Sequence, residues 1–230
     1  MPNKFIVTLR KRLKPKSISM SGVKISTDES IVTKEIRKTI YREDYEAAEA
    51  ELVRKHLRAD DRVLEIGGGI GFISLLCAKR CGVENVRTYE PNPKAVAAIR
   101  HNYLLNGMEP NLVEAVMTTA DGEMEFFIND NILSSSLAER EGGIPHTVTA
   151  HSFERVAEEF SPTVVVMDVE GAETDLLPAS AAAGVRAILA ELHPRIVGQQ
   201  VIDDLIQQMA DLGYPITSKI GSRVAMFERA

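Results

Sequence analysis

The chain has 230 residues, of which 44% are hydrophobic and 26% are charged, and this balance is typical of one globular domain with a sizeable core. Its formal net charge of -6 argues against a surface built throughout for nucleic acid, and no window offers the roughly 18 uncharged apolar residues of a membrane-spanning helix. The two cysteines have no Cys or His cluster beside them that would complete a zinc site, so we expect reduced core residues in a cytoplasmic protein.

The first segment, residues 1–16, differs in charge from the rest of the chain. Its charged residues are all basic: Lys4, Arg10, Lys11, Arg12, Lys14 and Lys16. We predict that residues 1–42 form a basic arm and lead-in, and that the domain itself spans residues 43–230. The arm is expected to be solvated or partly ordered, and the alternative is that its apolar residues, Phe5 to Leu9, touch an anionic membrane surface.

The regular alternation of elements begins after this lead-in. An amphipathic helix is predicted over residues 43–57, ahead of a short apolar run at 63–66 that predicts a strand. Glycines at 67–71 break the apolar pattern before it resumes as a helix over 72–79. A strand, a glycine turn and a helix in this order open a nucleotide-type βαβ unit.

The alternation continues with a second strand over residues 86–90. Asn92 is placed to cap the following helix, and Pro93 suits its first position because the missing N–H is not needed there. Gly107 supplies the left-handed residue that ends this helix. A third strand is predicted near residues 112–116.

Irregular sequence follows the third strand. Asp121 and Gly122 form a turn signal ahead of an apolar run at 124–128, so a hairpin-like excursion is expected to interrupt the βα alternation. Residues 129–146 are the least regular stretch, with three serines at 134–136, and predict a mobile loop over a site.

Regular alternation returns in the last third of the chain. Residues 164–167 form a continuous apolar run, as expected of a central parallel strand covered on both faces. A further strand is predicted at 187–192, then a helix that ends at Gly213, and a terminal antiparallel hairpin at 215–219 and 224–227. The predicted fold class is therefore α/β, a doubly wound Rossmann-like sheet of five parallel strands with a C-terminal antiparallel hairpin.

The sharpest local signal is the glycine loop after the first strand. Gly67, Gly69 and Gly71 let the backbone approach a ligand closely and adopt dihedral angles closed to other residues. Dehydrogenases hold a pyrophosphate with a similar loop, but here Phe72 stands in the place of their last glycine. Glu65, just before the loop, suits a cation such as an ammonium group better than it suits a pyrophosphate.

A second signal is Glu90, at the end of the second predicted strand. In this position a carboxylate can accept both hydroxyls of a ribose held over the glycine loop. The alternative is a structural role, in which the acid balances the dipole of the helix behind it. Together with the glycines, Glu90 and the neighbouring Asn92 are assigned as cofactor-binding residues.

Ionisable residues follow the fourth and fifth predicted strands, at Asp168, Glu170, Glu173, Glu191 and His193. The carboxyl ends of parallel strands meet at one edge of a sheet, where doubly wound folds bind ligands. Taken singly, each residue could be a helix cap or a hydrogen-bonded structural group, whereas together they predict a site. Their spacing forms no recognised metal motif, so metal binding is left open.

These segments resemble the FkbM-type methyltransferases over roughly residues 45–195. The matching segments lie at 63–71, 90–93, 102–107, 135–137, 168–173 and 191–193, and the string Asp-Val-Glu-Gly-Ala-Glu at 168–173 is the most specific of them. Two departures are visible. Glu65 replaces the family's usual aspartate, and Val116 with Met117 replaces its usual Ala-Leu near the adenine side.

The resemblance implies a class I methyltransferase fold, S-adenosylmethionine (SAM) as cofactor, and O-methylation of a sugar, glycolipid or secondary metabolite. The residues then expected to bind the cofactor are Glu65, Gly67, Gly69, Gly71, Glu90, Asn92, Val116 and Asp168. Methyl transfer itself depends mainly on holding the methyl group and the acceptor oxygen in line, with a base to remove the hydroxyl proton.

The candidates for this catalytic work lie after the fourth and fifth strands. His193 is expected to act as the base, because an unperturbed histidine has a pKa near 6.5. Asp168 is expected to orient the acceptor hydroxyl or the imidazole, and Glu170 and Glu173 are the next candidates for either role.

Three other functions fit parts of the sequence. A methyltransferase acting on RNA or another nitrogen nucleophile could use the basic arm for docking, but the acidic body and the lack of a basic, aromatic-rich stripe count against it. A non-catalytic SAM- or nucleotide-binding module and an NAD-dependent dehydrogenase are the others. The expected partner is therefore a hydroxylated small molecule or glycan, with no nucleic acid.

Overall fold

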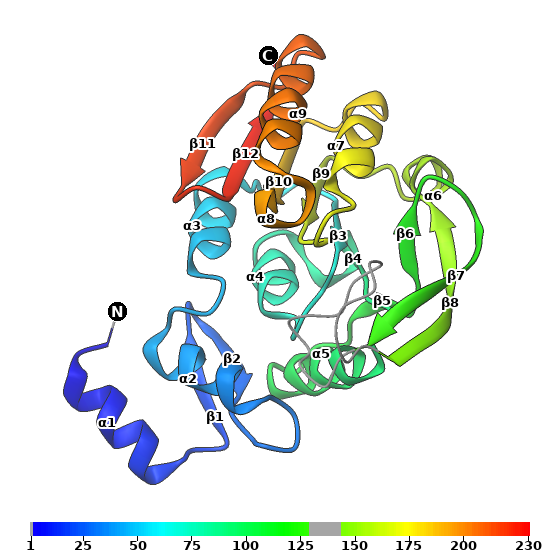
Figure 1. Cartoon of the computed structure of the whole chain (residues 1–230). Coiled ribbons are helices and arrows are strands. Elements are labelled where there is room, and N and C mark those ends of the chain that lie inside the picture. The colour runs from blue at the N-terminus through cyan, green and yellow to red at the C-terminus, as the bar shows by residue number, and fades with distance from the viewer. Residues whose placement is uncertain (1, 129–143) are drawn as a thin grey trace.

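The computed structural model describes residues 2–128 and 144–230, and its centre is a seven-stranded sheet flanked by helices (Figure 1). The strand order is β11-β12-β10-β9-β3-β4-β5. Five strands run parallel to one another: β3 (Val63–Ile66), β4 (Val86–Tyr89), β5 (Asn111–Val113), β9 (Val164–Met167) and β10 (Ala187–Glu191). The hairpin of β11 (Ile216–Ile220) and β12 (Val224–Glu228) joins β10 in antiparallel pairing. The predicted α/β fold class is thereby confirmed.

Alternate residues of the central strands face two separate apolar cores. Val63 and Val164 belong to one core, whereas Leu64 and Val165 belong to the other. The first core is closed by α3 (Ala47–His56), α4 (Phe72–Cys81) and α5 (Pro93–Leu105). The second is closed by α6 (Phe153–Phe160), α7 (Glu173–Ala182) and α9 (Gln199–Asp211). Coverage of both faces explains why the strands are continuous apolar runs.

The N-terminal part divides into a buried portion and an exposed one. Strands β1 (Ser17–Met20) and β2 (Val23–Ser26) form an antiparallel hairpin that is followed by α2 (Lys34–Arg42). Side chains of all three elements lie in the first core, and Asn102 of α5 accepts the N–H of Ser26 at 2.8 Å. In contrast, α1 (Lys4–Leu13) buries no residue. Residues 17–42 therefore share a core with the domain that the sequence predicts from residue 43 onward.

The excursion after β5 differs from the simple hairpin that we predicted. Strands β6 (Val116–Thr118), β7 (Gly122–Ile128) and β8 (Ile144–Ser152) form a separate sheet in the order β6-β8-β7. The antiparallel partner of β7 is β8, not the strand before it, and β8 also pairs in parallel with β6.

The third predicted strand, at 112–116, is divided between two sheets. It pairs with β4 only as far as Val113, because β4 ends opposite it at Tyr89, and Val116 begins β6. Residues 144–146 of the predicted loop belong to β8, and the predicted serine-rich part of that loop, at 134–136, lies outside the described residues.

Most helix boundaries follow their sequence signals. Asn92 caps α5 by accepting the N–H of Lys94, and Pro93 occupies the first turn, as predicted. The helix predicted from residue 43 begins only at Ala47, because Glu46 has a left-handed backbone with φ 45°. Short helices complete the fold: the 3-10 turn Val83–Asn85 and α8 (Pro194–Val197). Among the described residues, no helix has the length and apolar character needed to cross a bilayer.

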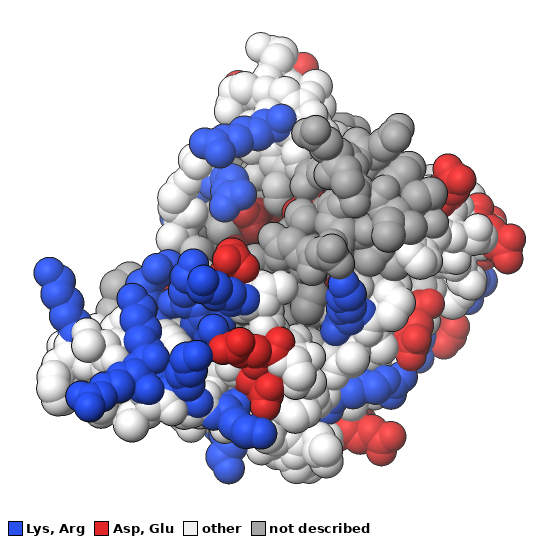
Figure 2. Space-filling model, turned by 60° about the horizontal axis from the view of Figure 1, so that its bottom comes forward, with Lys and Arg blue, Asp and Glu red and all other residues white. Residues whose placement is uncertain are grey.

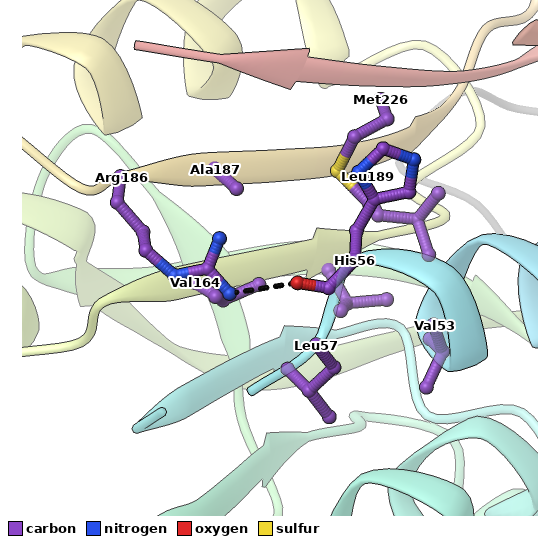
Figure 3. Close-up of a pocket in the computed structure, with 9 residues that line it drawn as sticks. Val53, His56, Leu57, Val164, Arg186, Ala187, Leu189 and Met226 are labelled. Carbon is purple, nitrogen blue, oxygen red and sulfur yellow. Dashed lines mark hydrogen bonds between the residues drawn. The ribbon is translucent and has the colours of Figure 1, made fainter. Parts of the chain in front are cut away.

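A hydrogen bond connects the end of α3 to the residue before β10 (Figure 3). Arg186, just before β10, donates one hydrogen bond to the carbonyl oxygen of His56 at 3.0 Å. The same guanidinium pairs with Asp61, which is buried. Apolar side chains including Val53 and Leu57 line a cavity of about 10 Å³ beside it. This contact fixes the end of α3 against the strands that carry the site.

Candidate functional site

Four of the predicted site residues lie side by side because the strands are in register. Ile66 of β3 is aligned with Tyr89 of β4 and with Met167 of β9, and Met167 is aligned with Ala190 of β10. The residue that follows each aligned position is Gly67, Glu90, Asp168 and Glu191, respectively. The sheet therefore brings the glycine loop and the acidic residues together at its carboxyl edge, where doubly wound folds bind ligands.

The glycine loop is closely packed, and Gly67 and Gly69 also have backbone angles that L-residues rarely adopt. Gly67 has φ +84°, and a Cβ atom there would lie 2.1 Å from the backbone oxygen of Asp168. Gly69 has φ +53°, and its Cβ would lie 3.1 Å from the hydroxyl of Tyr45 and 3.3 Å from a carboxylate oxygen of Glu46. The loop thus leaves its backbone open to a ligand at a point where L-residues would be strained.

Tyr45 and Glu46 are site residues that the sequence did not indicate. Both precede α3, and they reach the glycine loop across the first core rather than through any sequence motif. Burial, with the nearby carboxylates of Glu49 and Asp168, raises the pKa of Glu46 well above its usual value. Glu46 has a left-handed backbone, and a glutamate does not predict that conformation from sequence.

Glu65 lies beneath the loop rather than beside it. Its buried carboxylate accepts the hydroxyl of Thr88 at 2.8 Å and would lie 3.5 Å from a Cβ atom at Gly68. Burial raises the pKa of Glu65 to about 8. A cation bound above the loop would stabilise the ionised form of this group.

Glu90 contacts the loop directly. Its carboxylate accepts the N–H of Gly69 at 3.1 Å and the N–H of Asn92 at 2.9 Å. Burial raises its pKa to about 7, although these hydrogen bonds oppose the shift. Glu90 therefore ties the tip of the glycine loop to the start of α5, and Asn92 itself acts as the cap of that helix. Val116 lies in β6, outside the main sheet, and is buried.

Asp168, Glu191 and His193 form a compact cluster at the same edge. The imidazole Nε2 of His193 lies 3.4 Å from Asp168 and 4.0 Å from Glu191. Desolvation by the surrounding residues, together with the negative charge of Glu191, raises the pKa of Asp168 to about 7. Nearly half of the Asp168 side chain is nevertheless exposed to solvent. One donor atom from each residue lies within 4.8 Å of the others, so a divalent cation would bind here if the reaction used one.

Glu173 holds His193 from behind. It is fully buried, accepts the backbone N–H of His193 at 2.8 Å, and faces the imidazole Nδ1 at 3.4 Å. Burial alone would lower the pKa of His193, but the carboxylates of Glu173, Asp168 and Glu191 outweigh it and raise that pKa. Glu170, in the same loop, has a left-handed backbone with φ 45°. The structure thus separates Glu173, which positions the imidazole, from Asp168, which faces outward.

An open cleft of about 440 Å³ adjoins this cluster. It lies between the start of α3 and the β11–β12 turn, and its lining includes Glu46, Glu49, Glu191 and Arg223. Arg223 forms an ion pair with Glu191, with 2.8 Å between nitrogen and oxygen. The cleft is large enough for part of a small ligand and is predominantly acidic, so it favours cationic or hydroxyl-rich groups.

Comparisons with known proteins agree with this arrangement. A family model described as the methyltransferase FkbM domain matches residues 65–216. A methyltransferase FkbM structure from Methylobacillus flagellatus KT has a TM-score of 0.51 at 10% identity, covering 87% of this chain and 56% of that chain. The tRNA (uracil-54, C5)-methyltransferase of Pyrococcus abyssi, in complex with S-adenosyl-L-homocysteine, has a TM-score of 0.50 at 15% identity, covering 93% of this chain and 44% of that chain.

These structures share the fold, and this chain spans only about half the length of each. No curated protein sequence is significantly similar to it.

Proposed function

The chain belongs to the methyltransferase FkbM domain family, and we propose that it transfers the methyl group of SAM to a hydroxyl oxygen on a sugar, glycolipid or secondary metabolite. The observation that supports this proposal most strongly is the alignment of Gly67, Glu90 and Asp168 at one edge of the sheet. The glycine loop, the carboxylate of Glu90 and the carboxylate of Asp168 therefore lie within one site, which supports roles in approaching the cofactor, binding its ribose and accepting a proton, respectively.

The residues of the loop fit the proposed cofactor. The space above Gly69 is free of a Cβ atom and is bordered by Tyr45 and Glu46, while Glu65 and Asp168 add negative charge. This acidic cradle suits the ammonium of a methionine moiety, and Glu90 suits the ribose. When bound, SAM supplies an electrophilic methyl group on a positively charged sulfur.

Asp168 is the group we assign to accept the acceptor's proton. The sequence favours His193 for this role, but the surrounding carboxylates raise the pKa of His193, and the same carboxylates hold its imidazole between Asp168 and Glu173. Asp168 has a pKa near 7 and a side chain that reaches solvent, which suits a general base at neutral pH. With SAM bound, the acceptor oxygen would bond to the methyl carbon as the carbon–sulfur bond breaks, S-adenosyl-L-homocysteine would be left, and the hydroxyl proton would pass to the carboxylate of Asp168. His193 keeps that carboxylate in place.

A screen of acceptors with radiolabelled SAM tests this function. The full chain would be incubated with hydroxylated glycans, glycolipids and small metabolites in separate reactions, and with total RNA in another. Transfer of label to an alkali-stable methyl ether on a hydroxylated acceptor is the expected result. Label in RNA alone would instead support the nitrogen- or RNA-directed alternative, and SAM binding without transfer to any acceptor would favour a binding module.

A further inference from the structure

Helix α1 carries an apolar stripe that faces away from the rest of the molecule. Phe5, Leu9 and Leu13 are spaced four residues apart and therefore lie on one side of the helix. Their exposed fractions are 73%, 42% and 67%. Large apolar side chains aligned on a surface in this way indicate a binding face rather than a random exposure.

The opposite side of α1 holds the helix on the protein. Arg10 donates to the carbonyl oxygen of Tyr41 at 2.9 Å and pairs with Glu43 at 2.8 Å. Both partners lie within five residues of Glu46, which borders the glycine loop. The helix is thus fixed close to the site while its apolar stripe remains outside.

The segment that carries the stripe is rich in basic side chains. Residues 2–16 carry six of them and no acidic residue. Lys14 and Lys16 have acidic partners on the protein, Glu29 and Asp28, whereas the described residues supply no ion pair to Lys4, Lys11 or Arg12. The blue surface in Figure 2 gathers over this N-terminal part of the molecule. A helix that carries an apolar stripe on one side, and also the cations of Lys4, Lys11 and Arg12, is complementary to an anionic lipid bilayer.

A basic groove lies beside the helix. It has a volume of about 370 Å³ and is lined by Lys4, Lys11, Arg42 and Asp44, among others. Asp44 pairs with Arg42, and the two lysine ammonium groups are the remaining charges, which suits a phosphate headgroup. Asp44 also lines the acidic cleft next to Glu191, so the groove and the cleft adjoin each other.

We propose that α1 docks the protein on an anionic lipid bilayer, with Phe5, Leu9 and Leu13 entering the headgroup boundary and Lys4, Lys11 and Arg12 binding lipid phosphates. The docked surface holds the acidic cleft beside the membrane. Where the proposed function holds, this arrangement favours acceptors carried on lipids, since the hydroxyls of a headgroup in the groove lie next to the cleft. The docking itself does not depend on the reaction.

Vesicle co-sedimentation of the full chain tests the docking. Phosphatidylcholine vesicles are compared with vesicles that also contain phosphatidylserine, at low and at physiological salt. The wild type is expected to sediment with the anionic vesicles only, and less at the higher salt. The variants Phe5→Ser/Leu9→Ser/Leu13→Ser and Lys4→Glu/Lys11→Glu/Arg12→Glu are each expected to reduce the bound fraction by roughly tenfold.

A matched control removes exposed apolar side chains elsewhere. Leu104 and Leu212 are 74% and 50% exposed on α5 and just after α9, so Leu104→Ser/Leu212→Ser is expected to sediment like the wild type. Circular dichroism and SAM calorimetry, unchanged in both α1 variants, would show that they remain folded.

Two results would overturn the docking. One is equal sedimentation of the wild type and both α1 variants. The other is a wild-type dimer in sedimentation velocity that Phe5→Ser/Leu9→Ser/Leu13→Ser converts to a monomer without a change in vesicle binding, because the stripe would then cover a second copy. Failure of the acceptor screen with intact vesicle binding would count against the proposed reaction alone.

Discussion

The buried carboxylate of Glu173 accepts the backbone N–H of His193 at 2.8 Å and faces the Nδ1 atom of the same residue at 3.4 Å. A second oxygen of Glu173 accepts the N–H of Gly171 at 2.6 Å, so one side chain joins the loop after β9 to the end of β10. This contact directs the Nε2 atom of His193 toward Asp168. In the acidic string after β9, Asp168 therefore faces the open side of the site, and the buried Glu173 maintains the geometry of His193.

Removing either member of the Asp168–His193 pair is expected to impair turnover. Asp168→Asn and His193→Gln should each lower kcat by about 10² to 10⁴. His193→Gln should change SAM affinity little, whereas Asp168→Asn should also weaken it, because Asp168 contributes negative charge to the proposed ammonium site. Steady-state kinetics with an identified acceptor and calorimetry with SAM measure the two effects. Near wild-type turnover in Asp168→Asn would transfer the role of base to Glu170.

The pH dependence of turnover follows from the raised pKa of Asp168. A base must be ionised to act, so kcat/KM should rise with pH through about 7 and then level off. Asp168→Asn should lose this rising limb along with most of its activity. A profile whose limb stays near pH 7 in Asp168→Asn would show that another group titrates there.

Replacing Glu90 is expected to weaken cofactor binding. Glu90→Gln should reduce SAM affinity by about 1.5 to 3 kcal/mol, because the carboxylate is lost both to the ribose and to the N–H groups of Gly69 and Asn92. Calorimetry with SAM and with its demethylated product measures the loss. Equal affinity for NADH and SAM in the wild type would contradict the cofactor assignment itself.

Substitutions at Gly67 and at Gly69 should give different phenotypes. Gly67→Ala should destabilise the fold by roughly 3 kcal/mol or more, because its Cβ meets the backbone of Asp168, which cannot move aside. Gly69→Val meets only side chains, Tyr45 and Glu46, so it should abolish SAM binding with a smaller loss in Tm. Gly107→Ala is the matched control, since its φ is also positive but its Cβ would meet nothing within 4 Å.

The ion pair between Asp61 and Arg186 should contribute to stability in a pH-dependent way. Asp61→Asn removes the buried carboxylate that pairs with the partly exposed guanidinium of Arg186 and should lower the free energy of unfolding by about 1.5 to 3 kcal/mol at neutral pH. Although burial opposes the shift, hydrogen bonds from Arg186 lower the pKa of Asp61. The stabilisation is therefore present above the unfolded pKa of about 3.9 and is lost as pH falls through the lower folded value.

Urea unfolding at several pH values measures the gap in the free energy of unfolding between the wild type and Asp61→Asn. It should narrow as the solution becomes more acidic. Asp121→Asn, which breaks the exposed pair with Arg155, is the control and should change stability little at any pH. A gap that widens toward acid would contradict the assignment.

Sequence patterns predicted the parts of this structure that local chemistry determines. Residues 164–167 form a strand whose four apolar side chains are all buried, and Asn92 with Pro93 begins α5 because each suits its position there. The glycine loop and Asp168 were also identified from their positions at strand ends. The alignment of four strands then brought them together.

The parts that sequence did not predict depend on contacts between distant segments. The hairpin β1–β2 alternates apolar and polar residues around Ser21 and Gly22, but the sequence did not predict it. Its position depends on contacts with α5, one of which joins residues 76 positions apart in the chain. The parallel pairing of β6 with β8 joins residues more than thirty positions apart, which no local pattern specifies. Tyr45 approaches Gly69 for the same reason.

The packing of β1 and β2 on α5 determines when the hairpin can fold stably during synthesis of the chain. Ser26 leaves the ribosome long before Asn102, the residue 76 positions later that accepts its N–H. An isolated two-stranded hairpin is only marginally stable in water, so this segment gains lasting structure only once α5 has emerged. A nascent chain that pauses before Asn102 therefore presents Ile18, Ile25 and their neighbours to chaperones and proteases.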